Sequence, residues 1–281
     1  MSSPSHKRRG KFIVFEGLDK AGKSTQCARL ISNLQSLGHQ VQSLRFPDRT
    51  TPIGRLIDQY LRSGNDNNQP LNKDNDRLDN SGDTSTLSVP SDQAIHLLFS
   101  ANRWEHASAI EATLTSGTSI ICDRYYYSGC VYSAAKGVPG LDLAWARAPD
   151  VGLPRPDLCL LLDVSAEVAM KRAGGAAVST ASESVQGGGS GDSSTAIERY
   201  ETSGMQARVR QIFEELRSGA GGLGPERVDE ADDIVVVDAG ASLDDVEKEI
   251  LQRVLQAFDA VDAAGDGGAT GGAPLRRVKG W

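Results

Sequence analysis

The chain reads Gly17-Leu18-Asp19-Lys20-Ala21-Gly22-Lys23-Ser24-Thr25 between the apolar run Phe12–Phe15 and the amphipathic segment Lys23–Leu37. This order satisfies the pattern G-x-x-x-x-G-K-[ST] in a strand-to-helix context. Glycines let successive backbone N–H groups curl around phosphate oxygens, and the helix N-terminus adds a favourable dipole. The sequence therefore predicts that Gly17 to Thr25 bind a nucleoside triphosphate, with Lys23 on the β- and γ-phosphates and Ser24 on Mg²⁺. The alternative is a glycine-rich turn with an incidental lysine.

Five short apolar runs of this kind predict the strands of one sheet. They are Phe12–Phe15, Val41–Leu44, Ser119–Cys122, Leu158–Leu162 and Ile234–Val237. None alternates strictly between apolar and polar residues, which is typical of strands covered on both faces. Amphipathic helix patterns lie between them, over Lys23–Leu37, 92–115, 199–217 and 243–258. We expect an α/β fold of the P-loop NTPase type, with three α/β/α layers, a five-stranded parallel sheet and a mobile lid.

Four stretches lack the apolar residues that packing needs. They are a basic N-terminal tail at 1–11, insertions at 64–92 and 174–197, and a C-terminal tail at 259–281. Segments poor in apolar residues cannot offset the entropy lost on ordering. We predict a single domain over 12–258, with two disordered insertions and two flexible tails; the second insertion lies in the lid.

Charge and composition exclude several classes of partner. The formal net charge is −7, which disfavours a general electrostatic grip on nucleic acid, and the apolar runs of four or five residues are too short to span a membrane. The four cysteines form no C-x-x-C pair, so we expect neither a disulfide framework nor a zinc site. We expect a soluble cytoplasmic protein, with the nucleus as a second compartment because of the basic residues from Lys7 to Lys11.

Polar and aromatic residues follow the predicted strands, where ligands bind in an open α/β sheet. Arg49 and Arg124 are planar forks suited to a phosphate, and Phe99 can stack on a base with Arg103 one helical turn later. Asp123 ends a predicted strand and suits Mg²⁺. The alternatives are two surface arginines paired with neighbouring aspartates, and a Phe99 that belongs to the core.

A guanine-nucleotide switch should carry N-K-x-D after a late strand. The nearest string, Asn72-Lys73-Asp74-Asn75, lacks the final aspartate and falls in the first insertion. This argues against a switch.

Together these motifs resemble the eukaryotic branch of the thymidylate kinase family, over nearly all of the chain outside the insertions and tails. The resemblance implies transfer of a phosphoryl group from ATP to dTMP, with dUMP as a further expected acceptor, ATP as co-substrate, Mg²⁺ as cofactor and a homodimer. It implies a catalytic set of Lys23, Asp123, Arg124, Arg172 and Arg199. It implies an acceptor site of Asp19, Phe46, Arg49, Phe99, Arg103, Arg124, Tyr132, Tyr200 and Gln206.

Within that site the resemblance assigns Asp19 to the 3′-hydroxyl of the acceptor sugar and Tyr132 to crowding its 2′ position, although Tyr132 could instead be ordinary helix packing. Arg172 and Arg199 flank the lid insertion. Where the family has an arginine in the phosphate loop, this chain has Lys20, which lacks a bidentate fork. We expect Arg172 or Arg199 to carry more of the transition-state charge as a result.

Two other functions remain open from the residues alone. A related kinase with another deoxynucleotide or a deoxynucleoside as acceptor is one, but the Arg49 and Arg124 pair would have no phosphate to hold in a nucleoside. A catalytically idle nucleotide-binding protein is the other, and it would be expected to lose Lys23, Asp123 or the lid arginines, all of which are present.

Overall fold

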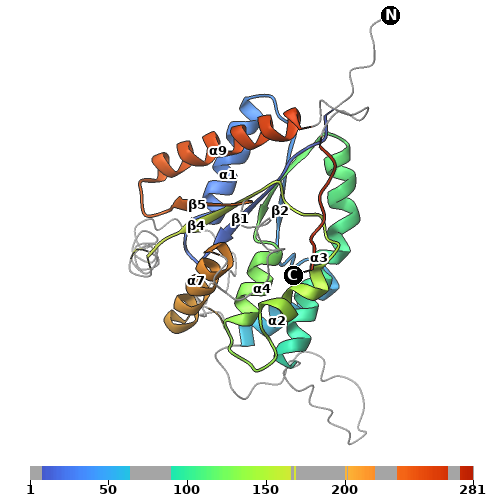
Figure 1. The fold of residues 1–281 in the computed structure, drawn as a ribbon, viewed down its shortest axis with the longest axis vertical. Coiled ribbons are helices and arrows are strands. Elements are labelled where there is room, and N and C mark those ends of the chain that lie inside the picture. Colours follow the sequence, from blue (N-terminus) through green and yellow to red (C-terminus); the bar gives the residue numbers. More distant parts are fainter. Residues whose placement is uncertain are drawn as a thin grey trace, which may run out of the picture.

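Five parallel strands form one sheet at the centre of the molecule (Figure 1). The computed structural model describes residues 8–63, 90–165, 168, 200, 202–218, 233–264 and 273–280. The strands are β1 (Phe12–Gly17), β2 (Val41–Arg45), β3 (Ser119–Asp123), β4 (Leu158–Asp163) and β5 (Ile234–Asp238), in the order β2-β3-β1-β4-β5. Every predicted strand is confirmed. β1 is central, with Val14 level with Cys122 on one side and Cys159 on the other.

Helices cover both faces of the sheet and give the three expected layers. One face carries α1 (Lys23–Ser36) and α9 (Leu243–Ala263), and the other carries α3 (Asp92–Thr115), α4 (Tyr126–Ala134) and α7 (Ser203–Ser218) (Figure 1). Successive side chains of β1 point to opposite faces, so Phe12 and Val14 join the core under α3, α4 and α7 while Ile13 and Phe15 join the core under α1 and α9. Both cores consist of buried apolar side chains, which hold the strand ends where the site is built.

Three short helices complete the described part of the fold: α2 (Pro52–Arg62), α5 (Leu143–Arg147) and the 3₁₀ turn η2 (Ala148–Asp150). α2 begins at Thr51, whose hydroxyl accepts a hydrogen bond of 2.9 Å from the backbone N–H of Gly54. Ser91 caps α3 in the same way. The caps set where α2 and α3 start, and these two helices pack on each other beside the sheet.

Two details of the sequence prediction are wrong. β2 is an edge strand with no fully buried residue, because only β3 pairs with it. The ends of the chain are also more ordered than expected. Arg9 pairs with Asp157 at 2.7 Å, α9 continues to Ala263, and Val278 is buried in a segment that adds an antiparallel bridge to Pro154.

The two predicted insertions lie almost wholly outside the described residues. Of the stretch 64–92, only 90–92 are described, and Asp92 is the first residue of α3. The stretch 174–197 is not described at all. Within the part of the chain that the structure describes, no helix combines the length and apolarity needed to cross a bilayer. All four cysteines are described and remain thiols.

Candidate active site

The loop from Gly17 to Ser24 leaves the carboxyl end of β1 and enters α1. Gly17 has a φ of 131°, and a Cβ there would lie 2.4 Å from the carbonyl oxygen of Leu162, so a side chain cannot be accommodated. Gly22 has a φ of 94°. The loop therefore has its shape because these two positions are glycines, as the motif predicts.

Lys23 lies inside this loop. Its Nζ donates hydrogen bonds to the carbonyl oxygens of Gly17 at 3.2 Å and Leu18 at 2.5 Å, and the side chain is buried. Burial, reinforced by the positive charge of Arg124, lowers the pKa of Lys23 to about 8. The ammonium group of Lys23 is thus fixed against the backbone of the loop.

A pair of hard oxygens faces the start of α1. The Ser24 hydroxyl donates a hydrogen bond of 2.6 Å to Oδ2 of Asp123, at the end of β3. The other oxygen, Oδ1, is buried and has no hydrogen-bond partner among the described residues. Among those residues, no group of three or more His, Cys, Asp or Glu is arranged so that it could hold a metal ion. Mg²⁺ needs no such cluster, because it binds through one or two protein oxygens together with phosphates and water. The donor set fits this ion.

Asp19 connects the phosphate loop to a neighbouring pocket. Its carboxylate pairs with Arg124 through one oxygen, while Tyr132 donates to the other at 3.1 Å. Burial alone would raise the pKa of Asp19, but the charges of Arg124 and Lys23 outweigh burial and lower it. Arg124 has a φ of 69°, in the left-handed region that non-glycine residues seldom adopt. The guanidinium group of Arg124 pairs with Asp19 and donates a hydrogen bond of 3.0 Å to Oγ of Ser128. These bonds stabilise the unusual backbone conformation.

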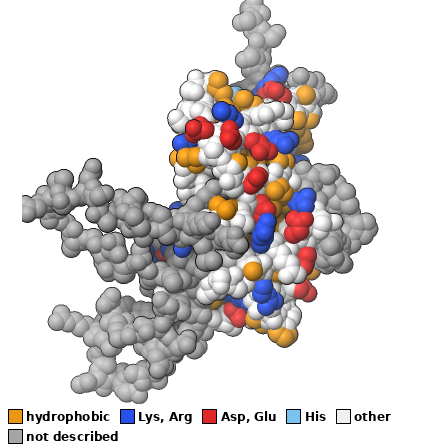
Figure 2. Space-filling view, turned by 90° about the vertical axis from the view of Figure 1, so that its left-hand side faces the viewer, with side chains coloured by type: hydrophobic (Ala, Val, Ile, Leu, Met, Phe, Trp, Pro, Cys, Tyr) orange, Lys and Arg blue, Asp and Glu red, His pale blue; other side chains and the backbone are white. Residues whose placement is uncertain are grey.

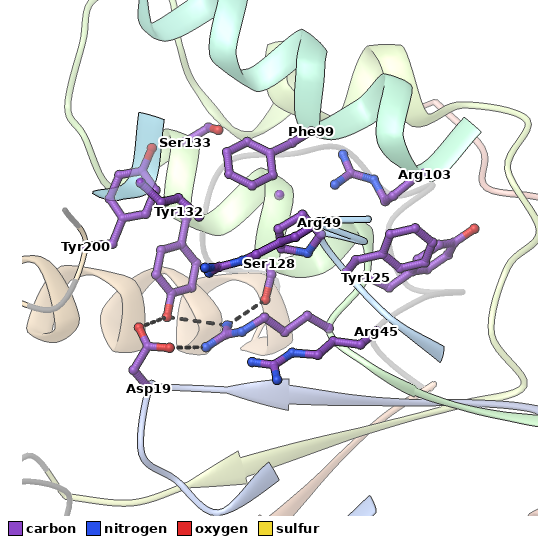
Figure 3. A pocket seen from close by; sticks show the side chains of 15 residues that line it. Asp19, Arg45, Arg49, Phe99, Arg103, Tyr125, Ser128, Tyr132, Ser133 and Tyr200 are labelled. Carbon is purple, nitrogen blue, oxygen red and sulfur yellow. Dashed lines mark hydrogen bonds and ion pairs between the residues drawn. The ribbon is translucent and has the colours of Figure 1, made fainter. Parts of the chain in front are cut away.

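This pocket is lined by Asp19 and has a volume of about 210 Å³. Phe46 and Tyr125 pack their rings 5.5 Å apart at one side, and Arg45 and Arg49 extend along it (Figure 3). Arg49 is part-exposed and forms an ion pair of 2.7 Å with Asp58. The pocket therefore gathers four guanidinium groups, those of Arg45, Arg49, Arg103 and Arg124, near the carboxylate of Asp19. Such a set suits an anionic ligand.

Phe99 and Arg103 reach the same pocket from α3 (Figure 3). Phe99 is half-buried and also packs on the small core of Ile57, Tyr60, Leu61 and Ile95. The sequence left open whether Phe99 packs in the core or lines the binding pocket. In the structure one side of the ring packs on this small core and the ring also lines the pocket. Arg103 is buried, and its fork is bound to Asp150 by bonds of 3.0 and 2.7 Å.

Tyr200 and Gln206, which follow the second predicted insertion, link Asp19 and the pocket to α7. Gln206 donates to Oδ2 of Asp19 at 2.9 Å and to the carbonyl oxygen of Tyr200 at 2.7 Å. Tyr200 in turn donates to the hydroxyl of Tyr60 at 3.2 Å. Arg172 and Arg199 lie outside the described residues.

The structure thus brings together the described part of the sequence-predicted site. Gly17 to Thr25 form one loop, and the predicted acceptor residues line one pocket except Gln206, which bonds to Asp19 from beside it. Lys20 is exposed with a φ of 63°. The surface-pair alternative for the arginines is wrong in its partners, since Arg49 pairs with Asp58 and Arg124 with Asp19.

Sequence reasoning missed Glu16 and Ser128. The carboxylate of Glu16 accepts hydrogen bonds from the backbone N–H groups of Tyr125 and Ser128 at 2.9 and 3.1 Å, and one from the Ser128 hydroxyl. Burial raises the pKa of Glu16. This carboxylate caps α4 from β1, in place of a local cap. A charged residue at the end of a buried strand was the only signal for it.

Comparisons with known proteins agree with this geometry. The family model for thymidylate kinase matches residues 15–73 and 85–186. The chain belongs to the thymidylate kinase family. It is 39% identical to a thymidylate kinase of Arabidopsis thaliana over 89% of this chain and 73% of that one, and 38% identical to one of Schizosaccharomyces pombe over 89% of this chain and 94% of that one. The solved thymidylate kinase of Candida albicans superposes with a TM-score of 0.61 at 33% identity, covering 89% of this chain and 93% of that one.

Membership of the thymidylate kinase family sets the class of reaction. Its enzymes are nucleoside monophosphate kinases that take their phosphoryl group from ATP. The P-loop NTPase fold and the eukaryotic relatives bear out the resemblance drawn from the motifs.

Proposed function

We propose that this enzyme transfers the γ-phosphoryl group of ATP to dTMP and releases dTDP and ADP. The observation that carries the proposal is the Asp19 carboxylate, which belongs to the phosphate loop yet is held by Arg124 and Tyr132 of the acceptor pocket. A donor loop and an anion-binding pocket that share one residue support binding of the two phosphates side by side. Such placement supplies most of the catalysis in phosphoryl transfer.

Each group has a part in the step. An oxygen of the dTMP phosphate attacks the γ-phosphorus, and the bond to the β-phosphate oxygen of ADP breaks. The acceptor oxygen is already anionic at neutral pH, so no strong base is needed. Lys23 stabilises the charge on the β- and γ-phosphates, and Arg49 and Arg124 hold the acceptor phosphate. Asp19 binds the 3′-hydroxyl of the sugar, and Tyr132 packs against its 2′ position. Phe99 stacks on the base, and Arg103 donates hydrogen bonds to it.

We further propose that Ser24 and Asp123 hold Mg²⁺, supported by the buried Oδ1 of Asp123. When bound, the ion neutralises charge on the phosphates of ATP. Arg172 and Arg199 are proposed to bring positive charge to the transferred phosphoryl group when the lid closes. Lys20 also supplies positive charge, but an ammonium group lacks the bidentate hydrogen bonding of a guanidinium group.

We also propose a homodimer. Leu97 and Trp104 lie seven residues apart on α3 and are 48% and 41% exposed, and Leu56 of α2 is 52% exposed. Exposed large apolar side chains on two helices that pack on each other favour a protein–protein surface. Light scattering of the purified protein tests this, and a monomer at micromolar concentration would overturn it.

On the face seen in Figure 2, positive and negative side chains are interspersed. For location we propose the cytoplasm, with the nucleus as a second compartment.

The experiment is an ADP-release assay with ATP and Mg²⁺, offering dTMP, dUMP, dCMP, UMP and thymidine in parallel. We expect dTMP to give the highest kcat/KM, with dUMP accepted more weakly. Highest activity with dCMP would contradict the base assignment. Highest activity with thymidine would contradict the phosphate role of Arg49 and Arg124.

A further inference from the structure

The guanidinium group of Arg103 is held in one plane by a second buried group. Nε and Nη2 of Arg103 donate to the two oxygens of Asp150 at 3.0 and 2.7 Å, and both side chains are at most 2% exposed. The Ser100 hydroxyl donates to the same carboxylate at 2.8 Å. A fork-to-fork pair fixes both the direction and the plane of an arginine. It leaves Nη1 as the nitrogen of Arg103 that is not engaged by Asp150.

Arg103 is also confined by α4. A Cβ at Gly129 would lie 2.8 Å from both Nη1 and Nη2, so the helix backbone approaches the guanidinium directly. Asp150 and Gly129 therefore both confine Arg103, which lines the pocket together with Phe99. Figure 3 shows Arg103 and Phe99 on the same side of the pocket. Any movement of Asp150 moves Arg103 relative to Phe99.

Asp150 lies in a turn that the C-terminal segment holds in place. The N–H of Gly152 donates to the carbonyl oxygen of Val278, and the N–H of Val278 donates to that of Leu153, both at 2.9 Å. On the other side of Asp150, Nε of Arg147 donates to the carbonyl oxygen of Lys279 at 2.7 Å. In Figure 1 this segment, in dark red, runs beside α3 toward the C-terminus.

The same segment is anchored independently of the turn. Val278 is 2% exposed and belongs to the core under α3, α4 and α7. Arg276 pairs with Asp233, the residue before β5, at 2.8 Å, and Arg277 pairs with Glu111 of α3. The segment thus joins the start of β5, α3 and the Asp150 turn, which are far apart in the sequence.

We propose that residues 275–279 form a C-terminal strap that positions the acceptor pocket: the strap holds the Asp150 turn, Asp150 orients Arg103, and Arg103 selects the base of the acceptor. Asp150 and Val278 are positioning residues in this scheme, since neither lines the pocket. The proposal rests on the proposed function, in which Arg103 meets the base. Without the strap the fold would keep its sheet but would bind and choose dTMP less well.

The test must separate positioning from stability. A segment that only stabilises the fold would lower the amount of active enzyme and leave each KM unchanged, whereas a positioning strap raises KM for dTMP and not KM for ATP. The indole Nε1 of Trp104 donates to the carbonyl oxygen of Pro149 at 2.7 Å, and its ring would contact a Cβ at Gly152. The emission of Trp104, taken as the difference between each enzyme and the same enzyme carrying Trp104→Phe, therefore reports on the turn itself and not on Trp145 or Trp281.

The variant is Val278→Ala in the full chain, with Arg253→Ala on the exposed face of α9 as matched control. For Val278→Ala we expect KM for dTMP to rise about 5-fold, below the ~100-fold effect of a 1 Å misplacement. We also expect the preference for dTMP over dCMP to fall by a similar factor, and Trp104 emission to shift. KM for ATP should stay within about twofold, as in the control. Unchanged KM for dTMP with unchanged base preference would overturn the proposal.

A double-mutant cycle then tests the route. If the strap acts through Asp150, adding Val278→Ala to Asp150→Asn should raise KM for dTMP no further. Additive effects would overturn the route. If Asp150→Asn does not fold, Ser100→Ala, which removes one bond to Asp150, takes its place.

Arg103→Lys separates this proposal from the proposed function. An Arg103→Lys enzyme with wild-type base preference would refute the role of Arg103 in the proposed function. A changed preference in Arg103→Lys together with a wild-type Val278→Ala would refute the strap alone.

Discussion

The hydroxyl of Tyr132 donates a hydrogen bond of 3.1 Å to Oδ2 of Asp19, while Arg124 holds the other oxygen of the same carboxylate. Tyr132 comes from α4 and Asp19 from the phosphate loop, so this bond joins the acceptor pocket to the donor loop (Figure 3). A carboxylate in a phosphate-binding loop would repel phosphate if it stood alone. Here its charge is matched by Arg124, which explains why the loop tolerates it.

Substitution at Tyr132 should separate its hydroxyl from its ring. Tyr132→Phe removes one hydrogen bond to a charged group, so KM for dTMP should rise about 10-fold. The preference for dTMP over UMP should survive, because the ring still crowds the sugar. Tyr132→Ala should lose that preference. Steady-state kinetics with both acceptors measure this, and equal discrimination in the two variants would count against the sugar role.

Phe99→Ala should weaken the acceptor and spare ATP. One lost base stack of roughly 1–3 kcal/mol predicts about 5- to 150-fold weaker dTMP binding. Calorimetric titration of dTMP measures it. Because Phe99 also packs on Ile57 and Tyr60, thermal unfolding of the variant must be recorded beside binding. Wild-type affinity with lowered stability would return Phe99 to the core alone.

The pH dependence of ATP use should report Lys23. Its pKa of about 8 means that the free enzyme loses this positive charge as the pH rises through that value. We expect kcat/KM for ATP to fall about tenfold per pH unit above pH ~8, while kcat falls less because bound phosphate keeps the amine protonated. Lys23→Ala should show neither turnover nor the slope but should still bind dTMP. Turnover by that variant would refute the phosphate-loop assignment.

His96 should contribute to acid sensitivity. It is fully buried, bonded to Ser133 and to the carbonyl oxygen of Ala146, and burial lowers its pKa to about 4. Between pH 6.5 and about 4 the unfolded chain binds a proton here and the folded chain does not. Its contribution to stability is therefore complete above pH 6.5 and lost as the pH falls toward 4, by about 3 kcal/mol in total.

Urea unfolding at several pH values compares the wild type with His96→Gln, using His39→Gln as matched control. The slope of unfolding free energy against pH should be smaller in His96→Gln. An unchanged slope would mean that His96 does not carry this effect.

Local patterns predict the frame of this molecule well. The apolar runs become β1 to β5 because each has the length of a strand and is mostly β-branched or leucine. The phosphate loop follows from Gly17, Gly22 and Lys23, whose roles depend on neighbours within a few residues. The same holds for Phe99 and Arg103, which share a helix face.

Contacts between distant parts of the chain escape such patterns. Asp150 lies 47 residues from Arg103, and Val278 lies farther still from the turn it holds. No local sequence pattern identifies Asp150 or Val278 as a positioning residue. The segment around Val278 has the composition of a flexible tail, because the residues that it packs against are distant in the sequence. Glu16 is similar, since its capping role needs the position of α4.

The most direct measurement follows the γ-phosphoryl group itself. ATP labelled at the γ-phosphate is incubated with the enzyme and Mg²⁺, with dTMP in one reaction and thymidine in the other, and the products are separated. We predict that the label appears in dTDP in the first reaction and stays in ATP in the second. Label recovered as inorganic phosphate, or transferred to thymidine in preference to dTMP, would contradict the account.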